Sequence, residues 1–502
     1  MLPRIASEAA RRFGNGTAYV APNGSQLSYG DVDRLSDRVA SGLAHRGVGA
    51  GDVLALVLPP SPEYLIAYLA AAKIGAITSG VNDRLAPSER DAILRIAEPK
   101  LTLAASGLEP TDTTLAVELV ATADHADGVL AALQRDHHVT TLADDPDRAL
   151  AIIFTSGTTG LPKGALYTNR QLKFITATDV GGHWGGGTRS FAGTSFAHLG
   201  FMTKLPGALM RGGTSFIMAR WRAHDALELL AREHMATVAG VPTQLALMLA
   251  DPAFDDLDLS GVQYIIVGGG PITPATAAEA RARFGAALAT RYSCTEAGIG
   301  LGTAFDDAAE DAIVSVGRPH AAVDLAVLDE DDQPVTTGAV GRVCLRSPAV
   351  MSGYWRDPEA TRAAFTRSGH VRTGDLGWID DRGRLRLVGR SKEMYVRGGY
   401  NVYPVEVEAV LSTHPDIAAV AIVAQPDPVM GEVGVAVVVP RSPHVPITLD
   451  ALHAFAGDRL ARYKLPEAIH TVDALPLTAA EKVDRAQLRR VLDARSRPPG
   501  PG

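Results

Sequence analysis

The sequence predicts an α/β protein with a large N-terminal domain, made of parallel-rich sheets, helices and a β subdomain, and a small α+β C-terminal domain. The chain has 502 residues, which is too long for one hydrophobic core. Residues 27–104 alternate helix-like and strand-like patterns, and this alternation favours parallel sheets covered by helices. Short strand-like pieces follow residue 314, and a compact α+β pattern follows residue 390.

The first elements follow from hydrophobic spacing. Residues 27–43 place Val32, Leu35, Val39 and Leu43 at helical intervals. The next expected elements are a strand at 53–58, a helix at 61–74, a strand at 76–81, a helix at 88–97 and a strand at 101–104. Residues 107–147 are polar and acidic, and no pattern with metal-ligand spacing surrounds the adjacent His137 and His138. We therefore predict a solvated connector there.

Composition narrows the class of protein. Hydrophobic residues make up 46% of the chain and charged residues 21%, as in soluble globular proteins. The net charge of −8 argues against nucleic acid as the main partner. Two cysteines indicate a reducing compartment. The N-terminus lacks the apolar core of a secretory signal, and the most apolar region, residues 53–81, is interrupted by prolines and charges, so it predicts no membrane span. We expect a cytoplasmic protein.

Residues 152–168 are the most informative stretch. An apolar, strand-like run ends in a segment of Thr, Ser and Gly, followed by Lys163. Glycines let the backbone approach a ligand closely, and successive backbone N–H groups in such a turn bind anions. The loop-forming residues are Thr155, Ser156, Gly157, Thr158, Thr159, Gly160 and Gly164. These parts suit a polyphosphate, although Lys163 is not followed by Ser or Thr as in the common nucleotide motif. Composition alone fits a surface loop equally well.

The spacing S-G-T-T-G-x-P-K-G resembles the signature loop of the adenylate-forming superfamily, in particular its acyl-CoA synthetase and fatty-acid–CoA ligase branch. The resemblance extends over residues 27–492. It implies ATP, Mg²⁺ and, as a substrate, coenzyme A. It also implies a large ATP- and acyl-binding domain at residues 1–389, a small mobile domain at 390–495 and a disordered tail at 496–502.

Two central motifs continue the resemblance. His198, in an otherwise apolar run, matches the family histidine that lines the acyl-carboxylate pocket. Residues 195–200 contain no aspartate, and a buried substrate ammonium without a partner is costly, so an α-amino acid is a poor substrate. Gly269 and Gly270 fall in the G-G-G-P turn, where the family backbone borders the adenine; a strand–helix turn is the alternative.

The segment Y-S-C-T-E matches the family's Y-G-x-T-E, with Ser293 in place of glycine. The resemblance implies that Tyr292 stacks on the purine, that Thr295 contacts the α-phosphate and that Glu296 holds Mg²⁺. It also implies that Asp375, in T-G-D, accepts hydrogen bonds from the ribose hydroxyls.

The C-terminal motifs complete the pattern. Arg390 resembles the arginine that contacts the nucleotide, and Lys392 stands at the hinge. Gly398 and Gly399 fall where relatives approach the pantetheine channel, and Lys482 matches the catalytic lysine. Two further departures from the family pattern occur: glutamate is usual at Arg342, and glycine is usual at Glu481.

The resemblance therefore implies an acid–thiol ligase that makes acyl-AMP and transfers the acyl group to coenzyme A. The residues expected in catalysis are Lys482, Glu296, Lys163 and His198. The segments expected to line the acyl pocket are apolar, which favours a fatty acid or other apolar acid, with an aryl acid close behind. The alternative is a stand-alone ligase that loads a carrier protein. The sequence leaves open a monomer or a homodimer.

Overall fold

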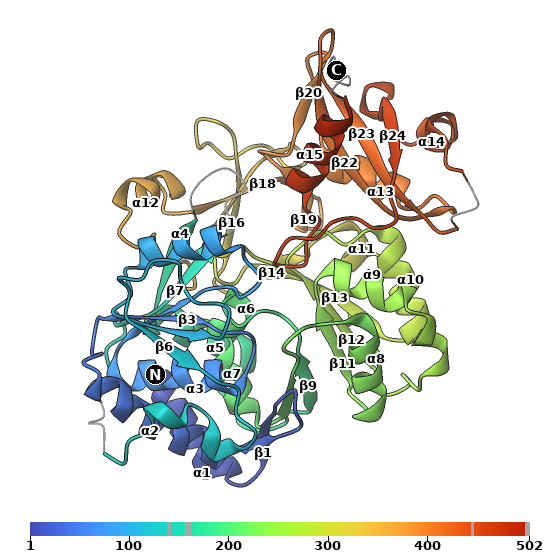
Figure 1. Ribbon diagram of the computed structural model, residues 1–502. Helices are drawn as coiled ribbons and strands as arrows, with labels where there is room; N and C mark the ends of the chain where they lie inside the picture. Colours follow the sequence, from blue (N-terminus) through green and yellow to red (C-terminus); the bar gives the residue numbers. More distant parts are fainter. Residues whose placement is uncertain (138–141, 156–161, 443–445, 497–502) are drawn as a thin grey trace, which may run out of the picture.

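The computed structural model describes residues 1–137, 142–155, 162–442 and 446–496. Figure 1 shows a large N-terminal part, coloured blue through yellow, and a smaller orange and red C-terminal part above it. The predicted α/β class, with a large and a small domain, is confirmed. The predicted boundary before residue 390 falls at the end of strand β19, and the exact domain limits stay a prediction.

A six-stranded sheet forms the centre of the large part. Its strand order is β6-β5-β3-β4-β7-β8, and all neighbours are parallel except β7 and β8. The bounds are β3 Val53–Val57, β4 Ile77–Gly80, β5 Leu101–Ala105, β6 Val117–Val120, β7 Ala149–Thr155 and β8 Lys163–Thr168. The expected solvated connector is thus partly wrong, because β6 adds to the sheet by pairing with the edge of β5.

The helices around this sheet begin and end where local capping dictates. The helix expected from residue 27 begins later, because residues Gln26–Ser28 form β2 and Ser28 caps α2 through Asp31. Helix α3 is buried along its whole length, since its sequence is apolar on all sides. The bounds are α1 Leu2–Phe13, α2 Tyr29–His45, α3 Pro62–Ile74, α4 Pro87–Ala97, α5 Asn169–Val180, α6 Leu199–Met202 and α7 Leu205–Arg211.

Two further sheets complete the α/β part. The first has the order β2-β1-β10-β9 and the second β11-β12-β13-β14-β15. Their strands are β1 Thr17–Val20, β2 Gln26–Ser28, β9 Arg189–Ala192, β10 Thr214–Ile217, β11 Thr237–Gly240, β12 Tyr264–Gly268, β13 Ala287–Tyr292, β14 Leu301–Gly302 and β15 Arg318–Pro319. The accompanying helices are α8 Ala223–Arg232, α9 Pro242–Ala250, α10 Pro274–Phe284 and α11 Asp311–Val314.

The remaining sheets are mostly antiparallel. One has the order β16-β17-β18-β19 and forms the predicted β subdomain; the other has the order β21-β20-β23-β22, with β24 parallel to β23. Their strands are β16 Asp324–Leu328, β17 Gly341–Arg346, β18 Val371–Ile379, β19 Leu385–Arg390, β20 Tyr395–Arg397, β21 Tyr400–Val402, β22 Ile417–Asp427, β23 Gly431–Pro440 and β24 Ala468–Thr471. The helices are α12 Pro358–Ala364, α13 Pro404–Leu411, α14 Leu449–Ala456 and α15 Arg485–Ser496.

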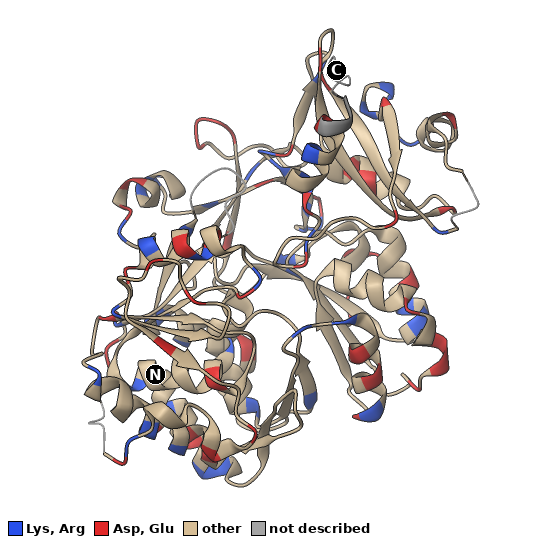
Figure 2. Ribbon diagram, in the orientation of Figure 1, with Lys and Arg blue, Asp and Glu red and all other residues tan. Residues whose placement is uncertain are grey.

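The distribution of charged residues and the hydropathy of the helices are consistent with the composition of the chain. Figure 2 shows Lys and Arg interspersed with Asp and Glu over the described elements. Within the described ranges, no helix has the length and apolar character needed to cross a membrane.

Candidate active site

The phosphate-loop prediction falls on a β-hairpin. Thr155 ends β7 and pairs in register with Lys163, the first residue of β8. The Lys163 ammonium lies 5.2 Å from the centre of the Tyr354 ring. Ser156, Gly157, Thr158, Thr159 and Gly160 lie outside the described residues.

Gly164 has a structural role in the hairpin. A Cβ at this position would lie 2.5 Å from Ile152 Cγ2 and 3.1 Å from the Phe154 ring, both on β7. The missing side chain therefore makes room for the neighbouring strand. The sequence predicted that Gly164 lets the backbone approach a ligand. Its surroundings indicate instead that it lets β7 and β8 pack closely.

Glu296 is connected to the hairpin through Tyr354. The Tyr354 hydroxyl donates a hydrogen bond of 2.7 Å to Glu296 Oε1, while Lys163 lies against the same ring. The Tyr167 hydroxyl donates a bond of 2.6 Å to the carbonyl of Thr295 and so anchors the loop after β13. Tyr354 was not predicted as a site residue, because only the fold brings it to Glu296.

The substitution at Ser293 is accommodated without unusual backbone. Ser293 is not among the described non-glycine residues with positive φ. Its hydroxyl donates a bond of 3.2 Å to the carbonyl of Cys294. A glycine is therefore not required here for its conformational freedom.

Buried Tyr292 and Asp375 form a polar cluster with Arg390, whose side chain is partly exposed. The Tyr292 hydroxyl donates a bond of 2.7 Å to Asp375 Oδ2, and Arg390 Nε lies 3.1 Å from Asp375 Oδ1. Asp375 on β18 and Arg390 on β19 face each other in the strand register. Burial raises the pKa of the Asp375 carboxyl, and the Arg390 guanidinium opposes this rise.

His198 lies at the N-terminus of α6, beside Asn82. The amide Nδ2 of Asn82 is 3.0 Å from His198 Nε2, and since the amide nitrogen can only donate, Nε2 is the accepting nitrogen. Burial, together with the cations of Lys482 and Arg84, lowers the pKa of His198 to about 4. The imidazole is therefore neutral at pH 7.

Lys482 lies beside Gly269, which is in the turn after β12. Its Cε is 3.9 Å from the position that a Cβ on Gly269 would occupy, and Gly269 has φ +79°. The side chain as a whole is exposed. Burial and the charge of Arg390 lower the pKa of Lys482, and Asp375 opposes this effect. Lys482 in turn lowers the pKa of His198, so this cation of the C-terminal part acts electrostatically on both His198 and the Asp375–Arg390 pair.

The other predicted residues lie around this centre or away from it. Gly270 would place a Cβ 3.7 Å from Pro242 Cδ, on the same side as Gly269. Lys392 follows β19 in the turn to β20. Gly398 and Gly399 form the β20–β21 turn with φ +54° and +88°, and the N–H of Gly398 donates a bond of 2.8 Å to the carbonyl of Met430. Figure 1 places β20 at the top of the molecule, distant from β13 and β14.

Asn82 and Arg84 were not predicted as site residues. They follow β4, which runs parallel to β7, so both strands end at the same edge of the sheet as the phosphate-type hairpin. Polar residues at the carboxyl ends of adjacent parallel strands are typical of ligand sites. That rule could have identified them.

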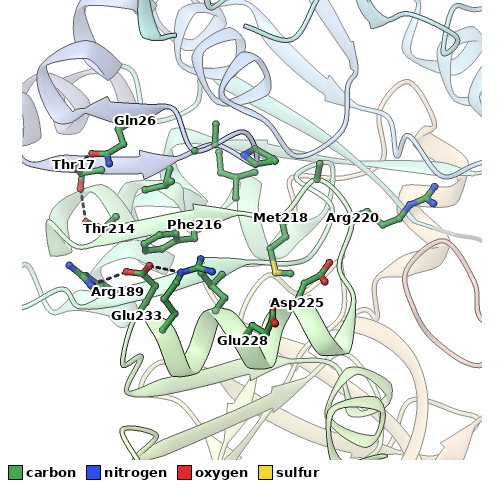
Figure 3. A pocket seen from close by; sticks show the side chains of 18 residues that line it. Thr17, Gln26, Arg189, Thr214, Phe216, Met218, Arg220, Asp225, Glu228 and Glu233 are labelled. Carbon is green, nitrogen blue, oxygen red and sulfur yellow. Dashed lines mark hydrogen bonds and ion pairs between the residues drawn. The ribbon is translucent and has the colours of Figure 1, made fainter. Parts of the chain in front are cut away.

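A second hollow lies elsewhere, between strands β1 and β10 and helix α8. It has a volume of about 640 Å³ and is drawn in Figure 3. Two of its arginines, Arg189 and Arg232, pair with Glu233 at 2.8 Å and 3.1 Å. None of the residues that line this hollow is among those predicted for the site.

Comparisons with known proteins agree with this geometry. Residues 6–355 match the family model "AMP-binding enzyme", and residues 406–482 match "AMP-binding enzyme C-terminal domain". A feruloyl-CoA synthase of Amycolatopsis sp is 33% identical over 96% of this chain and 97% of its own. The long-chain-fatty-acid–CoA ligase FadD13 of Mycobacterium tuberculosis is 32% identical over 95% of each chain. ATP-bound MatB from Rhodopseudomonas palustris superposes with a TM-score of 0.87 at 26% identity, covering 99% of this chain and 100% of its own.

Proposed function

The chain belongs to the AMP-binding enzyme family and is an AMP-forming acid–CoA ligase, and we propose that its acid substrate is apolar and is activated beside Lys482. The position of Lys482 carries this proposal. It acts electrostatically on His198 on one side and on the Asp375–Arg390 pair on the other. A cation between an acyl-type site and a nucleotide-type site is what the first half-reaction needs.

The chemistry explains why cations are needed. The carboxylate oxygen of the acid attacks the α-phosphorus of ATP, the bond to the pyrophosphate oxygen breaks, and acyl-AMP and pyrophosphate form. Two anions must approach each other, so the site has to offset their repulsion with preorganised positive charge. Lys482 would act at the α-phosphate and the carboxylate. Lys163, on the hairpin that follows β7, would act at the pyrophosphate.

Neutral His198 fits the carboxylate side. With Nε2 accepting from Asn82, the proton of the ring lies on Nδ1 and is available as a donor. Tyr292, Asp375 and Arg390 would hold the adenosine, with Asp375 accepting from the ribose hydroxyls and Gly269 and Gly270 bordering the adenine. The hydroxyl of Thr295 would contact the α-phosphate.

Glu296 is suited to hold Mg²⁺ together with the phosphates of ATP. Its carboxylate supplies the oxygen ligands that Mg²⁺ prefers, and Tyr354 orients it. Over the residues that the structure describes, no group of three or more His, Cys, Asp or Glu side chains forms a ready-made metal site. These residues therefore fit a Mg²⁺ ion that binds together with ATP. There the ion would neutralise phosphate charge.

The second half-reaction transfers the acyl group. The thiol of coenzyme A attacks the acyl carbon, its proton is released, and AMP leaves. Since Lys482 occupies the space beside the adenylate, we propose that the C-terminal domain swings about Lys392 to admit the thiol, with Gly398 and Gly399 then approaching the pantetheine arm. While the C-terminal domain covers the site, it also protects acyl-AMP from water.

The acid itself is proposed from the apolar character of the segments expected to line its pocket. Phe196 and Phe201 stack with ring centres 3.7 Å apart, and Tyr64 meets both edge-on. Tyr64 and Phe196 are buried core residues, so the chain around His198 is packed on an apolar interior. Such surroundings favour a fatty or aryl acid over a polar one. Two of the relatives named above are a feruloyl-CoA synthase and a long-chain-fatty-acid–CoA ligase, which supports the same class. They are CoA ligases, so a carrier protein as acceptor is not favoured.

Pyrophosphate release tests the proposal. The protein would be assayed with ATP and Mg²⁺ across fatty acids of increasing length, benzoates, cinnamates and α-amino acids, each with and without coenzyme A. We expect an apolar acid to stimulate release and coenzyme A to convert the product to a thioester. Stimulation by α-amino acids alone would contradict the substrate class, and an accumulated acyl-AMP that ignores coenzyme A would contradict the acceptor.

A further inference from the structure

Glu481, which immediately precedes Lys482, has an unusual backbone. Its φ is +60°, in the left-handed region that is disfavoured for residues with a Cβ. The family resemblance expects glycine here, which would adopt this φ freely. A non-glycine residue keeps such a conformation only where its surroundings over-determine it, so the side chain of Glu481 must have contacts that hold it.

Both carboxylate oxygens of Glu481 contact the large N-terminal part. Arg84 donates to Oε1, and the side-chain amide of Gln244 donates to Oε2. The exposed fractions of the Glu481 and Arg84 side chains are only 14% and 22%. This shielding makes the ion pair stronger than one at the open surface.

The two partners are themselves held in place. The N–H of Arg84 donates a bond of 2.9 Å to Asn82 Oδ1, just after β4. Gln244 lies in the first turn of α9 and accepts a bond of 3.1 Å from the N–H of Val241. Because Arg84 lies in the turn after β4 and Gln244 lies in helix α9, Glu481 joins the C-terminal part to two separate segments of the large part.

Hydrogen bonds within the loop connect Glu481 to Lys482, so the contacts of Glu481 also restrain Lys482. The N–H of Thr478 donates a bond of 2.7 Å to the carbonyl of Lys482, and the N–H of Glu481 donates one of 2.9 Å to the carbonyl of Thr478. Asn82, which contacts His198, also donates a bond of 3.4 Å to the carbonyl of Ala479. In Figure 1 this segment, between β24 and α15, runs down from the C-terminal part to the large part.

We propose that Glu481 is a positioning residue. Its two contacts, with Arg84 and Gln244, are called the clasp here, and they hold Lys482 in the arrangement for acyl-AMP formation. The inference rests on the proposed function. The carboxylate points to Arg84 and Gln244, so it leaves the charge of Lys482 available to the reacting anions. When the domain swings for thioester formation, both contacts must break. The clasp therefore biases the enzyme toward the first half-reaction and opposes the second.

The test separates the two half-reactions in purified full-length enzyme. E481Q removes the charge that pairs with Arg84 while keeping the side-chain length. We expect acyl-AMP formation, measured as pyrophosphate release, to fall roughly tenfold. Thioester formation from supplied acyl-AMP should be unchanged or faster. The matched control is E279Q, which removes the 4.0 Å contact of Glu279 with Arg441 between the same two parts of the chain; it should change neither rate.

A double-mutant cycle keeps the test specific. If Glu481 and Arg84 act as one contact, R84Q should reproduce the loss, and E481Q/R84Q should be no slower than E481Q alone. R84Q also tests the clasp if E481Q does not fold. An unchanged rate of pyrophosphate release in both variants, or equal losses in both half-reactions, would contradict the positioning role of Glu481. Neither result would contradict the proposed ligase function. A wild-type enzyme that forms no acyl-AMP with any acid would instead overturn the proposed function.

Discussion

The neutral state of His198 should make the stability of the protein depend on pH. Its pKa in the folded chain is about 4, below the value of about 6.5 for an unfolded histidine. Between these values the unfolded chain binds more protons than the folded chain, so the free energy of unfolding falls as the pH falls. The contribution is fully present above pH 6.5 and is lost progressively down to pH 4.

The magnitude follows from these two pKa values. Complete loss would correspond to about 3 kcal/mol, and the part lost between pH 7 and pH 5 to about 2 kcal/mol. Because the His198 side chain is partly exposed, solvent makes this an upper value. The substitution H198Q removes the titration and keeps an acceptor for Asn82. Wild type should therefore lose up to about 2 kcal/mol more than H198Q on going from pH 7 to pH 5.

Urea unfolding of both proteins at pH 5, 6 and 7, followed by tryptophan fluorescence, measures this difference. His224 provides a control of opposite sign, since its hydrogen bond to Asp251 raises the pKa of that imidazole. Its stabilising contact is present at low pH and is lost as the pH rises, so H224Q should lower stability more at pH 5 than at pH 7. The same pH dependence in wild type and H198Q would refute the reasoning.

Three further predictions concern the site and its support. K482A should depress acyl-AMP formation by roughly 10²–10³ and leave thioester formation from supplied acyl-AMP largely intact; equal loss in both half-reactions would contradict the role of Lys482. D375N removes the charge that pairs with the guanidinium on β19, and we expect the KM for ATP to rise about tenfold; an unaltered KM in pyrophosphate-release assays would argue against a ribose contact. G164A places a Cβ 2.5 Å from Ile152 Cγ2 and should lower the free energy of unfolding by about 1–3 kcal/mol, whereas G200A, with open space at its Cβ, should unfold under nearly the same conditions as wild type.

Local sequence predicted the fold well where pattern and capping agree. The alternation of helix and strand over residues 53–104 appears as β3, α3, β4, α4 and β5, because each apolar run ends at a Pro, Gly or capping residue that also stops it in the structure. The error at β6 has a different origin. This strand is an edge strand with an exposed Leu119, so it lacks the hydrophobic run that makes a buried strand visible.

The site was predictable only in its local motifs. The hairpin with Lys163 and the segment around Glu296 stand out because several chemical groups occur within a few residues. Tyr354 and Arg84 do not, because their contacts are with residues distant in the chain, such as Glu296 for Tyr354 and Glu481 for Arg84. No periodicity or spacing in one sequence encodes such a contact. It arises when the fold brings loops from distant parts of the chain together.

The pattern of ion pairs around Lys482 explains how this site keeps a usable positive charge. Arg390 is paired with Asp375, and Arg84 is paired with Glu481. Lys482 itself makes no ion pair within the part of the chain that the structure describes, and burial lowers its pKa. An unpaired, partly desolvated ammonium is destabilised until an anion arrives, so it interacts more strongly with a carboxylate and a phosphate than a paired cation could. The two neighbouring carboxylates thus pair with the arginines, and under the proposed function Lys482 would be left to bind the substrates.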